Sequence, residues 1–259
     1  VKRTTYVGAR FSGDETPFLM QQKWNVQFSV ITVYRPIESV GYQYIRTDGK
    51  KLQLVTEMYK SIHEIANGCY DDAVRRLAKD IAKKGDTVWI RMLHEFNSNT
   101  YVWGLYPFSD ESIRTFKKAW QRIVKIYREE NAPVKFQLCF LGSNTHGDKT
   151  PFIAFNPGSS FVDQVGVDVY VNAGSKMVSL QERLDSGIYD ALLQFGKPIF
   201  IGEVGVTPAI GDRAQWIKDA WKSLAVDFTR VIAVSFFLEC KSVTRQWCLT
   251  NQEEINAFV

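Results

Sequence analysis

Strand-like segments recur along this chain at a nearly regular interval, and this rhythm constrains the fold more than any other feature. After an opening strand at residues 6–10, apolar segments begin near residues 28, 60, 88, 134, 165, 198 and 231. Successive starts therefore lie 32, 28, 46, 31, 33 and 33 residues apart, and helical patterns fill most of the intervals. Strands and helices alternating in this way predict an α/β protein with a single (β/α)8 (TIM) barrel. An open, doubly wound sheet is the alternative, but residues 8–13 lack the glycine spacing of its phosphate-binding turn.

Local periodicity predicts the individual elements. Runs of β-forming residues predict strands over residues 26–34, 60–65, 87–93, 134–141, 165–170, 198–203 and 231–238. The helical spacing of apolar residues predicts helices over residues 15–24, 48–58, 71–84, 109–130, 180–195 and 213–228, and residues 251–258 close the chain. Residues 142–158, rich in Gly, Asn, Pro and Thr, are expected to form a long loop. With 259 residues, of which 45% are hydrophobic, the chain can build one large core, so we expect residues 1–259 to form a single domain.

Composition and charge argue against several classes of function. The net charge is +4 and the Lys and Arg residues are dispersed, whereas a nucleic-acid-binding surface needs them concentrated. No run of about eighteen apolar residues is present, so we expect no membrane-spanning helix. Three histidines without an H-x-H pair, and four cysteines without a C-x-x-C pair, disfavour a catalytic metal or a zinc ribbon, so we expect no metal and no cofactor. Cys139 is expected to be a buried thiol, while the spacing of Cys240 and Cys248 leaves open whether they form a disulfide.

Two of the predicted strands end in a glutamate. The strand over residues 87–93 runs directly into His94 and Glu95, and the strand over residues 198–203 ends at Glu203. In a barrel the carboxyl ends of the strands converge on one face, and the fourth and seventh strands lie on opposite sides of the ring. We therefore expect Glu95 and Glu203 to face each other across one cleft. A protonated carboxyl group opposite an ionised one is the arrangement that cleaves glycosidic bonds.

Other polar residues on the same strands are expected to support this pair. Tyr170 ends the sixth strand, where its hydroxyl can donate a hydrogen bond to Glu203. Asp168, two residues earlier, is expected to point into the same barrel interior. Arg10 and Arg91 lie on strands where an inward charge needs a partner. Either arginine could orient a catalytic carboxylate or bind sugar hydroxyls.

Three segments of the chain resemble a known family. The run R-M-L-H-E-F-N-S-N-T-Y-V-W at residues 91–103 is similar to the acid/base signature of glycoside hydrolase family 26. The run K-P-I-F-I-G-E-V-G at residues 197–205 resembles its nucleophile strand, and F-V-D-Q-V-G-V-D-V-Y at residues 161–170 resembles its strand-six motif. That family is known best for endo-β-1,4-mannanases. The resemblance implies Glu95 as acid/base, Glu203 as nucleophile, His94 and Tyr170 as neighbours of the reacting sugar, and Trp103 as a wall of the cleft.

The chain also departs from the family pattern. Residues 98–100 stand between Asn97 and the aromatic residue that usually follows closely, and the family's tryptophan on strand eight is replaced by Phe236 or Phe237. Trp247, from the loop after that strand, could take its place. The expected substrate-binding residues are thus His94, Tyr170, Trp103, Phe236, Trp247 and Arg91.

These observations lead to one main functional hypothesis. The resemblance and the two glutamates predict a retaining endo-β-glycosidase that acts on a polysaccharide, with β-1,4-mannan as the first candidate and a β-1,3/1,4-glucan or xylan as alternatives. A barrel that binds carbohydrate but no longer cleaves it is a hypothesis of a different class, motivated by the altered loop after Asn97. A barrel enzyme acting on something other than a sugar is the third, if the cleft is narrow and apolar. We expect a monomer whose partner is a polysaccharide or oligosaccharide, and an extracellular location because such substrates are bulky.

Overall fold

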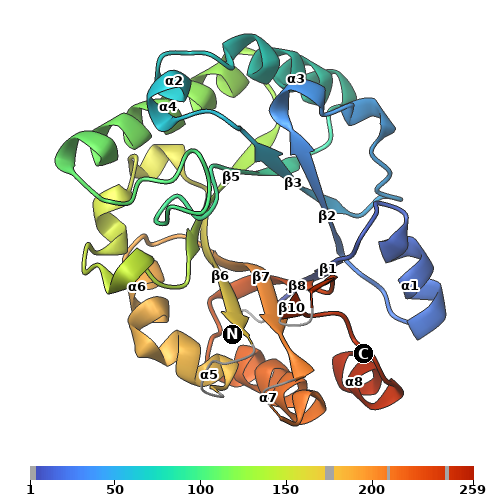
Figure 1. Ribbon diagram of the computed structural model, residues 1–259. Coiled ribbons are helices and arrows are strands. Elements are labelled where there is room, and N and C mark those ends of the chain that lie inside the picture. Colours follow the sequence, from blue (N-terminus) through green and yellow to red (C-terminus); the bar gives the residue numbers. More distant parts are fainter. Residues whose placement is uncertain (1–3, 173–177, 209–210, 243–244) are drawn as a thin grey trace.

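The computed structural model describes residues 4–172, 178–208, 211–242 and 245–259. In this part of the chain eight parallel strands close a barrel in sequence order, and β1 pairs with β8 to complete the ring (Figure 1). The predicted (β/α)8 barrel is therefore confirmed. The strands are β1 (Tyr6–Arg10), β2 (Val30–Pro36), β3 (Lys51–Glu57), β4 (Val88–Met92), β5 (Val134–Leu141), β6 (Gln164–Val171), β7 (Ile199–Val206) and β8 (Val231–Phe237). That residues 1–259 form a single domain stays a prediction.

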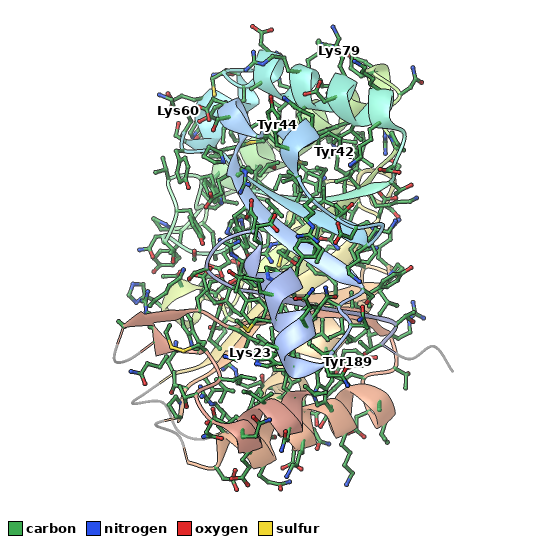
Figure 2. The ribbon with its side chains drawn as sticks, turned by 90° about the vertical axis from the view of Figure 1, so that its right-hand side faces the viewer. Lys23, Tyr42, Tyr44, Lys60, Lys79 and Tyr189 are labelled. Carbon is green, nitrogen blue, oxygen red and sulfur yellow. A yellow bond between two sulfur atoms is a disulfide. The ribbon has the colours of Figure 1, made fainter. Side chains whose placement is uncertain are left out.

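Helices surround the barrel on its outside (Figure 1). They are α1 (Thr16–Trp24), α2 (Ile62–Ala66), α3 (Asp71–Lys84), α4 (Asp110–Glu129), α5 (Leu180–Arg183), α6 (Tyr189–Leu193), α7 (Arg213–Val226) and α8 (Gln252–Phe258). Short 3-10 helices lie at η1 (Ile37–Ser39), η2 (Tyr42–Tyr44), η3 (Thr145–Gly147), η4 (Phe152–Phe155) and η5 (Ser159–Phe161), and a π-helix at η6 (Leu184–Ile188). Lysines such as Lys23, Lys60 and Lys79 extend outward from this layer into solvent (Figure 2). Among the described residues no helix is both long enough and apolar enough to span a bilayer.

Amphipathic sequence explains the long helices. Ala73, Val74, Leu77 and Ile81 of α3 are buried, as their spacing predicts, while the intervening charged side chains face water. Ser109 caps α4 as predicted, because its side chain accepts a hydrogen bond from the amide at N3. Both helices thus bury one face against the barrel.

One region differs from the prediction. The helix expected over residues 48–58 and the strand expected over residues 60–65 are both wrong: the structure has strand β3 at Lys51–Glu57 and helix α2 at Ile62–Ala66. The strand was missed because the polar residue Gln53 interrupts its apolar pattern. In the structure Gln53 faces the barrel interior and forms hydrogen bonds there. Ser61 and Glu64 form a capping box that starts α2, a pattern visible in the sequence that the prediction overlooked.

The helix expected over residues 180–195 is also interrupted. It divides into α5, η6 and α6. Gly187, at φ 103°, lies in the interruption, and its left-handed backbone conformation is one that glycine adopts without steric cost.

Polar side chains form a connected network inside the barrel. The Thr32 hydroxyl and the Gln53 carbonyl are 3.0 Å apart, Gln53 donates to Gln137 at 2.7 Å, and Gln137 donates to Gln164 at 2.6 Å. Thr32 also lies 3.3 Å from Ser235 of β8. The network joins β2, β3, β5, β6 and β8, so the barrel interior is a packed, hydrogen-bonded floor and not a pore.

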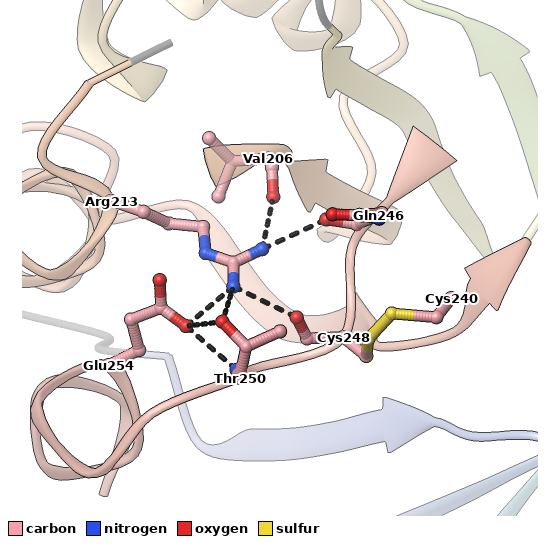
Figure 3. Close-up of a disulfide and its surroundings, with 7 residues drawn as sticks. All are labelled: Val206, Arg213, Cys240, Gln246, Cys248, Thr250 and Glu254. Atoms are coloured by element: carbon pink, nitrogen blue, oxygen red, sulfur yellow. Dashed lines mark hydrogen bonds and ion pairs between the residues drawn. A yellow bond between two sulfur atoms is a disulfide. The ribbon is translucent and has the colours of Figure 1, made fainter. Parts of the chain in front are cut away.

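A disulfide closes the segment after β8. It joins Cys240 and Cys248 across a short hairpin made of β9 (Cys240–Ser242) and β10 (Arg245–Gln246) (Figure 3). The question that the sequence left open is thereby answered. Cys139 is buried and free, as predicted, and Cys69 is exposed and free.

Candidate active site

A cleft of about 490 Å³ opens at the carboxyl ends of the barrel strands. Both Glu95 and Glu203 line it, as do Tyr170 and Trp247 from the expected substrate-binding set. Its remaining walls include the aromatic residues Tyr34, Tyr101 and Phe237. The cleft therefore combines carboxyl groups with rings, the lining that a sugar requires.

Glu203 lies at an irregular point of β7. The pairing register shifts between Val167 and Asp168 on the β6 side, and between Ile201 and Val204 on the β8 side. The neighbouring Gly202 leaves the space that this site needs. A Cβ atom there would lie 2.5 Å from Arg91 Nη1 and 2.5 Å from Asp168 Oδ1, so a side chain would displace one of them.

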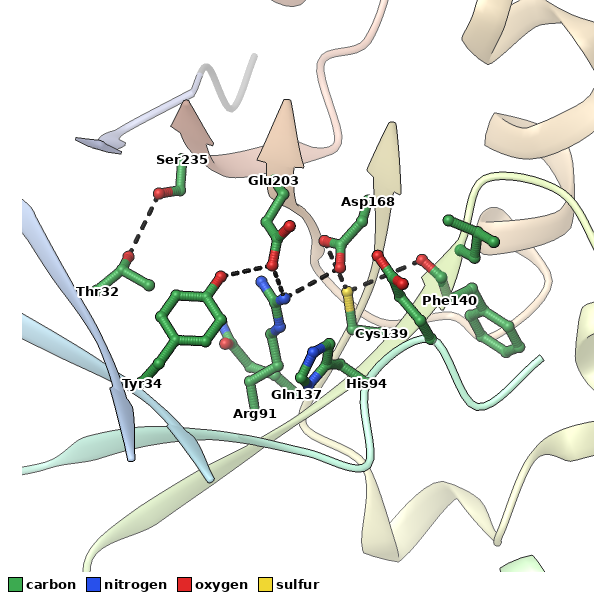
Figure 4. Close-up of polar contacts among 12 residues, drawn as sticks. Thr32, Tyr34, Arg91, His94, Gln137, Cys139, Phe140, Asp168, Glu203 and Ser235 are labelled. Carbon is green, nitrogen blue, oxygen red and sulfur yellow. Dashed lines mark hydrogen bonds and ion pairs between the residues drawn. The ribbon is translucent and has the colours of Figure 1, made fainter. Parts of the chain in front are cut away.

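Three groups bind the Glu203 carboxylate. The Tyr34 hydroxyl donates a hydrogen bond to one of its oxygens, and the Arg91 guanidinium forms an ion pair with it (Figure 4). The Tyr170 hydroxyl donates a hydrogen bond to the other oxygen. Burial alone would raise the pKa of Glu203, but Arg91 and the two hydroxyls lower it to about 2. Glu203 is therefore ionised at neutral pH. The hydrogen bond expected from Tyr170 is present, whereas Tyr34 was not singled out from the sequence.

Glu95 has the opposite electrostatic environment. It follows β4 in a left-handed backbone conformation with φ 53°, and Ser98 donates a hydrogen bond to its carbonyl oxygen at 2.8 Å. The residue is 7% exposed. Burial, and secondly the negative charge of Glu203, raise the pKa of Glu95 to about 7. Near neutral pH this carboxyl group can hold a proton and give it away.

The two glutamates lie close together, with Asp168 beside them. One carboxyl oxygen from each of the three lies within 4.8 Å of the others. Asp168 accepts a hydrogen bond from Arg91 at 3.0 Å and from the Cys139 thiol at 3.2 Å. Burial, opposed by Arg91, raises the pKa of Asp168 well above its usual range. Within this trio Glu203 is thus the group whose pKa falls, because Arg91 and two tyrosine hydroxyls favour its charged form.

Three converging carboxyl groups could in principle hold a metal ion. Among the described residues this trio is the cluster whose oxygens come close enough. However, Arg91 already lies against two of its members, Asp168 and Glu203. The positive charge that a metal would bring is therefore supplied by the chain itself.

The structure corrects the expected role of Arg91. Its side chain is fully buried beneath the cleft and contacts Glu203 and Asp168. The sequence left two roles open for Arg91: orienting a carboxylate or binding sugar hydroxyls. The geometry supports the first role, because the guanidinium contacts the carboxylates and lies outside the cleft lining. The guanidinium is inside because an inward-pointing side chain of β4 meets the carboxylates of β6 and β7 there.

His94 is likewise buried beneath the cleft. Its ring packs edge-on against Tyr101 at 4.7 Å and Trp103 at 5.5 Å, and it does not line the cavity. Burial lowers the pKa of His94 to about 3, so the ring is neutral. Neither ring nitrogen has a hydrogen-bond partner within the described part of the chain. Direct contact with a sugar is therefore not part of this geometry.

Trp103 does not form a wall of the cleft, and that expectation is wrong. It is fully buried, and its Nε1 donates to the His94 carbonyl oxygen at 2.9 Å. Tyr101 lies flat upon it, with ring centroids 4.4 Å apart and planes inclined by 5°, and it is Tyr101 that lines the cavity. The loop folds back after the strand, which places the second ring behind the first.

Phe236 is also not a cleft residue, contrary to the expectation. It points outward and packs against Trp221 of α7 at 5.2 Å and Phe258 of α8 at 5.1 Å. Phe237 faces the cavity instead. Successive side chains of a strand point to opposite faces, so only one of the two neighbours can point inward.

Comparisons with known proteins find similar sequences and similar folds. The model described as glycosyl hydrolase family 26 matches residues 49–229. Endoglucanase H of Acetivibrio thermocellus is 28% identical over 238 residues, which are 89% of this chain and 25% of that protein. A mannan endo-1,4-beta-mannosidase of Bacillus subtilis is 31% identical over 144 residues, which are 53% of this chain and 36% of that protein. The aligned part of the chain thus covers only 25% and 36% of the lengths of these two relatives.

Solved structures share the architecture. A mannanase from Bacillus subtilis has a TM-score of 0.69 at 16% identity, with 100% of this chain and 85% of that chain covered. A β-mannanase from Bacteroides ovatus has a TM-score of 0.68 at 14% identity, with 98% and 84% covered. At such low identity these likenesses show the fold alone.

Proposed function

Because the chain belongs to glycosyl hydrolase family 26, we propose that it is a retaining glycoside hydrolase that cleaves internal β-linkages of a polysaccharide. The observation that carries this proposal is the closeness of two carboxyl groups with opposite protonation. Oxygens of Glu95 and Glu203 lie within 4.8 Å, while the pKa of one is raised to about 7 and that of the other is lowered to about 2. Retaining glycosidases have carboxyl groups about 5–5.5 Å apart, whereas inverting ones leave about 6.5–9.5 Å for a water molecule.

The reaction would proceed by double displacement. The ionised Glu203 attacks the anomeric carbon, while Glu95 gives its proton to the departing glycosidic oxygen as that bond breaks. Glu95 is then ionised and takes a proton from water. This water attacks the same carbon and releases Glu203 as a carboxylate, which regenerates both starting protonation states.

Three neighbours would support the nucleophile. Tyr34, Tyr170 and Arg91 hold the Glu203 carboxylate in one orientation and keep it charged. Fixed donors of this kind need no reorganisation when the reaction begins, which lowers the barrier.

The substrate class is argued from the cleft and the relatives. Tyr101, Phe237 and Trp247 offer ring faces against which a sugar can stack. We propose β-1,4-mannan as the first substrate, because one relative carries the name mannan endo-1,4-beta-mannosidase. A β-glucan is the second candidate, because the relative that aligns over 89% of the chain is named Endoglucanase H. The expected extracellular location and monomeric state remain part of this proposal.

The test is a substrate panel followed by stereochemistry. The protein is incubated with β-mannan, mixed-linkage β-glucan and xylan, and proton NMR follows the anomer that first appears. We expect oligosaccharides of several lengths and initial β-configuration. An initial α-anomer would contradict the assignment of Glu203 as nucleophile, and binding without cleavage would favour the carbohydrate-binding barrel.

A variant pair makes the assignment specific. Glu203→Gln removes the attacking oxygen and should lower kcat by roughly four orders of magnitude. Glu253→Gln makes the same chemical change at an exposed position of α8 and should leave kcat unchanged. Circular dichroism of both variants checks that the barrel is intact.

A further inference from the structure

The backbone that carries Glu95 has an uncommon conformation. Leu93 and Glu95, on either side of His94, both lie in the left-handed region, with φ 50° and φ 53°. Residues with a side chain rarely adopt such values, because the Cβ atom then crowds the neighbouring carbonyl oxygen. A conformation of this kind persists only where the surrounding contacts impose it. The contacts around Glu95 therefore decide where its carboxyl group lies.

Hydrogen bonds on both sides of Glu95 hold this conformation. The Glu95 amide donates to the Cys139 carbonyl oxygen of β5 at 3.0 Å. The Glu95 carbonyl oxygen accepts a hydrogen bond from the Ser98 hydroxyl at 2.8 Å. The first bond joins two backbone groups and does not depend on the side chains. The second depends on the serine hydroxyl, so a single substitution can remove it.

Ser98 is itself held in place by the loop that follows it. The residue opens the stretch at residues 98–100 that departs from the family pattern, and it is 1% exposed. Its hydroxyl also accepts a hydrogen bond from the Thr100 amide at 3.2 Å, and its carbonyl oxygen accepts one from the Tyr106 amide at 3.3 Å. Gly104 packs so closely against the same carbonyl oxygen that a Cβ atom there would collide with it. The Ser98 hydroxyl thus binds Glu95 from a well-supported position.

We propose that Ser98 is a positioning residue for the acid/base Glu95. Its hydroxyl fixes the peptide group that follows Glu95, and this keeps a Glu95 carboxyl oxygen within 4.8 Å of one from Glu203. Without the hydroxyl, the backbone of Glu95 relaxes toward an ordinary conformation, and its carboxyl group moves away from the glycosidic oxygen that it must protonate. Ser98 is buried, so it acts through Glu95 and not on the sugar. This inference rests on the proposed function, since it concerns the proton donor of that reaction.

A residue that positions only the acid leaves a specific kinetic signature. Proton donation matters most when the leaving group is a sugar hydroxyl, because the unprotonated alkoxide departs slowly. It matters little when the leaving group is dinitrophenolate, which is stable as an anion. A loss of folded protein, by contrast, lowers the rate with both kinds of substrate by the same factor. The ratio of the two rates therefore separates positioning from stability.

The test measures kcat/KM of Ser98→Ala on two substrates. These are the panel polysaccharide that the wild type cleaves fastest and the dinitrophenyl β-glycoside of the oligosaccharide released from it. With the polysaccharide we expect a loss of roughly tenfold to 100-fold, the range for a misplacement of up to about 1 Å. With the dinitrophenyl glycoside the loss should be less than about threefold. Ser98→Thr keeps the hydroxyl and should restore most of the activity on the polysaccharide.

The pH profile gives a second measurement. Burial, and secondly the negative charge of Glu203, raise the pKa of Glu95 to about 7. When the Glu95 carboxyl group moves away from Glu203, both causes weaken and the pKa of Glu95 falls. In Ser98→Ala the alkaline limb of kcat/KM on the polysaccharide should therefore move to lower pH. An alkaline limb at the wild-type position would contradict the proposal.

Ser223→Ala is the matched control. Ser223 is also buried, and its hydroxyl donates to a backbone carbonyl oxygen, that of Asp219 in α7, at 2.9 Å. This variant makes the same chemical change away from the cleft and should leave kcat/KM unchanged on both substrates. If Ser98→Ala does not fold, Ser98→Cys takes its place, because a thiol is a weaker donor than a hydroxyl. It should show a smaller loss that is again confined to the polysaccharide.

Two kinds of outcome overturn the proposal. Equal losses on both substrates in the Ser98 variants, or an unchanged kcat/KM in folded Ser98→Ala, would leave Ser98 without a positioning role. Glu95→Gln is the reference: if it loses activity only on the polysaccharide while Ser98→Ala does not, this inference is wrong and the proposed function stands. If the wild type cleaves neither substrate, or Glu95→Gln cleaves the polysaccharide as fast as the wild type, the proposed function is wrong and this inference fails with it.

Discussion

A single guanidinium determines how the carboxyl groups at the barrel mouth share their protons. Arg91 forms ion pairs with Glu203 and Asp168, and its charge is the chief reason that the pKa of Glu203 falls despite burial. The pKa of Glu95 is raised by burial and by the negative charge of Glu203. One buried cation thus separates the pKa values of two carboxyl groups that differ only in their surroundings.

The pH dependence of activity follows from these two pKa values. The proposed mechanism needs Glu95 protonated, so kcat/KM should fall as pH rises through about 7, and it needs Glu203 ionised, so it should fall again only near pH 2. In Glu95→Gln the alkaline limb should disappear, together with most of the activity toward substrates with poor leaving groups. The pH profile and the residual activity of Glu95→Gln can both be measured on a substrate with an activated leaving group, which needs less help from an acid. An unchanged alkaline limb would exclude Glu95 as the acid.

Tyr34 is predicted to be a positioning residue that acts through Glu203. Tyr34→Phe removes a hydrogen bond to a charged group, worth about 1.5–3 kcal/mol, which corresponds to a roughly tenfold to 150-fold loss in kcat/KM. The pKa of Glu203 should rise, so the acidic limb of the pH profile should move upward. Tyr44→Phe, at an exposed tyrosine on the outer surface, is the matched control and should change neither quantity.

At the scale of the element, the pleat of β8 separates two adjacent phenylalanines. Phe237 lines the cleft, while Phe236 packs against Trp221 and Phe258 under helices α7 and α8. The residues are chemically identical and adjacent in sequence. Their surroundings differ because successive side chains of a strand point to opposite faces.

This difference gives a paired prediction. Phe237→Ala should raise KM several-fold, because this ring lines the cleft. Phe236→Ala should lower the free energy of unfolding by about 3–5 kcal/mol through the cavity that it leaves, with KM unchanged in the folded fraction. Steady-state kinetics and urea unfolding of both variants measure the contrast, and a reversal of the two effects would show that the strand faces are assigned incorrectly.

At the scale of the whole molecule, closure of the ring brings distant polar residues together. Gln53, Gln137 and Gln164 are far apart in sequence yet form one chain of hydrogen bonds across the barrel interior. Two of the strands that this network joins, β2 and β6, also carry Tyr34 and Tyr170, which bind the Glu203 carboxylate. It fixes these strands relative to one another, because buried polar groups are costly unless all are paired.

The network should be sensitive to a single break. Gln137→Leu removes the acceptor of the Gln53 amide nitrogen and the donor to the Gln164 carbonyl oxygen. Each buried polar group left unpaired lowers the free energy of unfolding by about 1–3 kcal/mol. Gln22→Leu, an exposed glutamine on α1, is the control and should change stability by less than about 0.5 kcal/mol. Urea unfolding decides, and equal stabilities of the two variants would mean that the interior network contributes little.

The sequence by itself determined the barrel and the positions of the two glutamates. The interval between strands encodes the strand–helix alternation, and parallel strands in a closed ring place Glu95 and Glu203 on one face whatever the loops do. The region of β3 and α2 was misassigned, because the inward residue Gln53 resembles a surface residue until its partners are known. The helix expected over residues 180–195 is interrupted at Gly187.

Only the tertiary structure decided which residues from different segments of the chain come into contact. Tyr34 became a partner of Glu203, Arg91 lay beneath the carboxylates, Tyr101 covered Trp103, and Cys240 joined Cys248. Local patterns report burial and periodicity, but the face that each side chain occupies depends on register and on the irregularity at Glu203. These are set only when the eight strands close, since closure fixes which distant side chains meet.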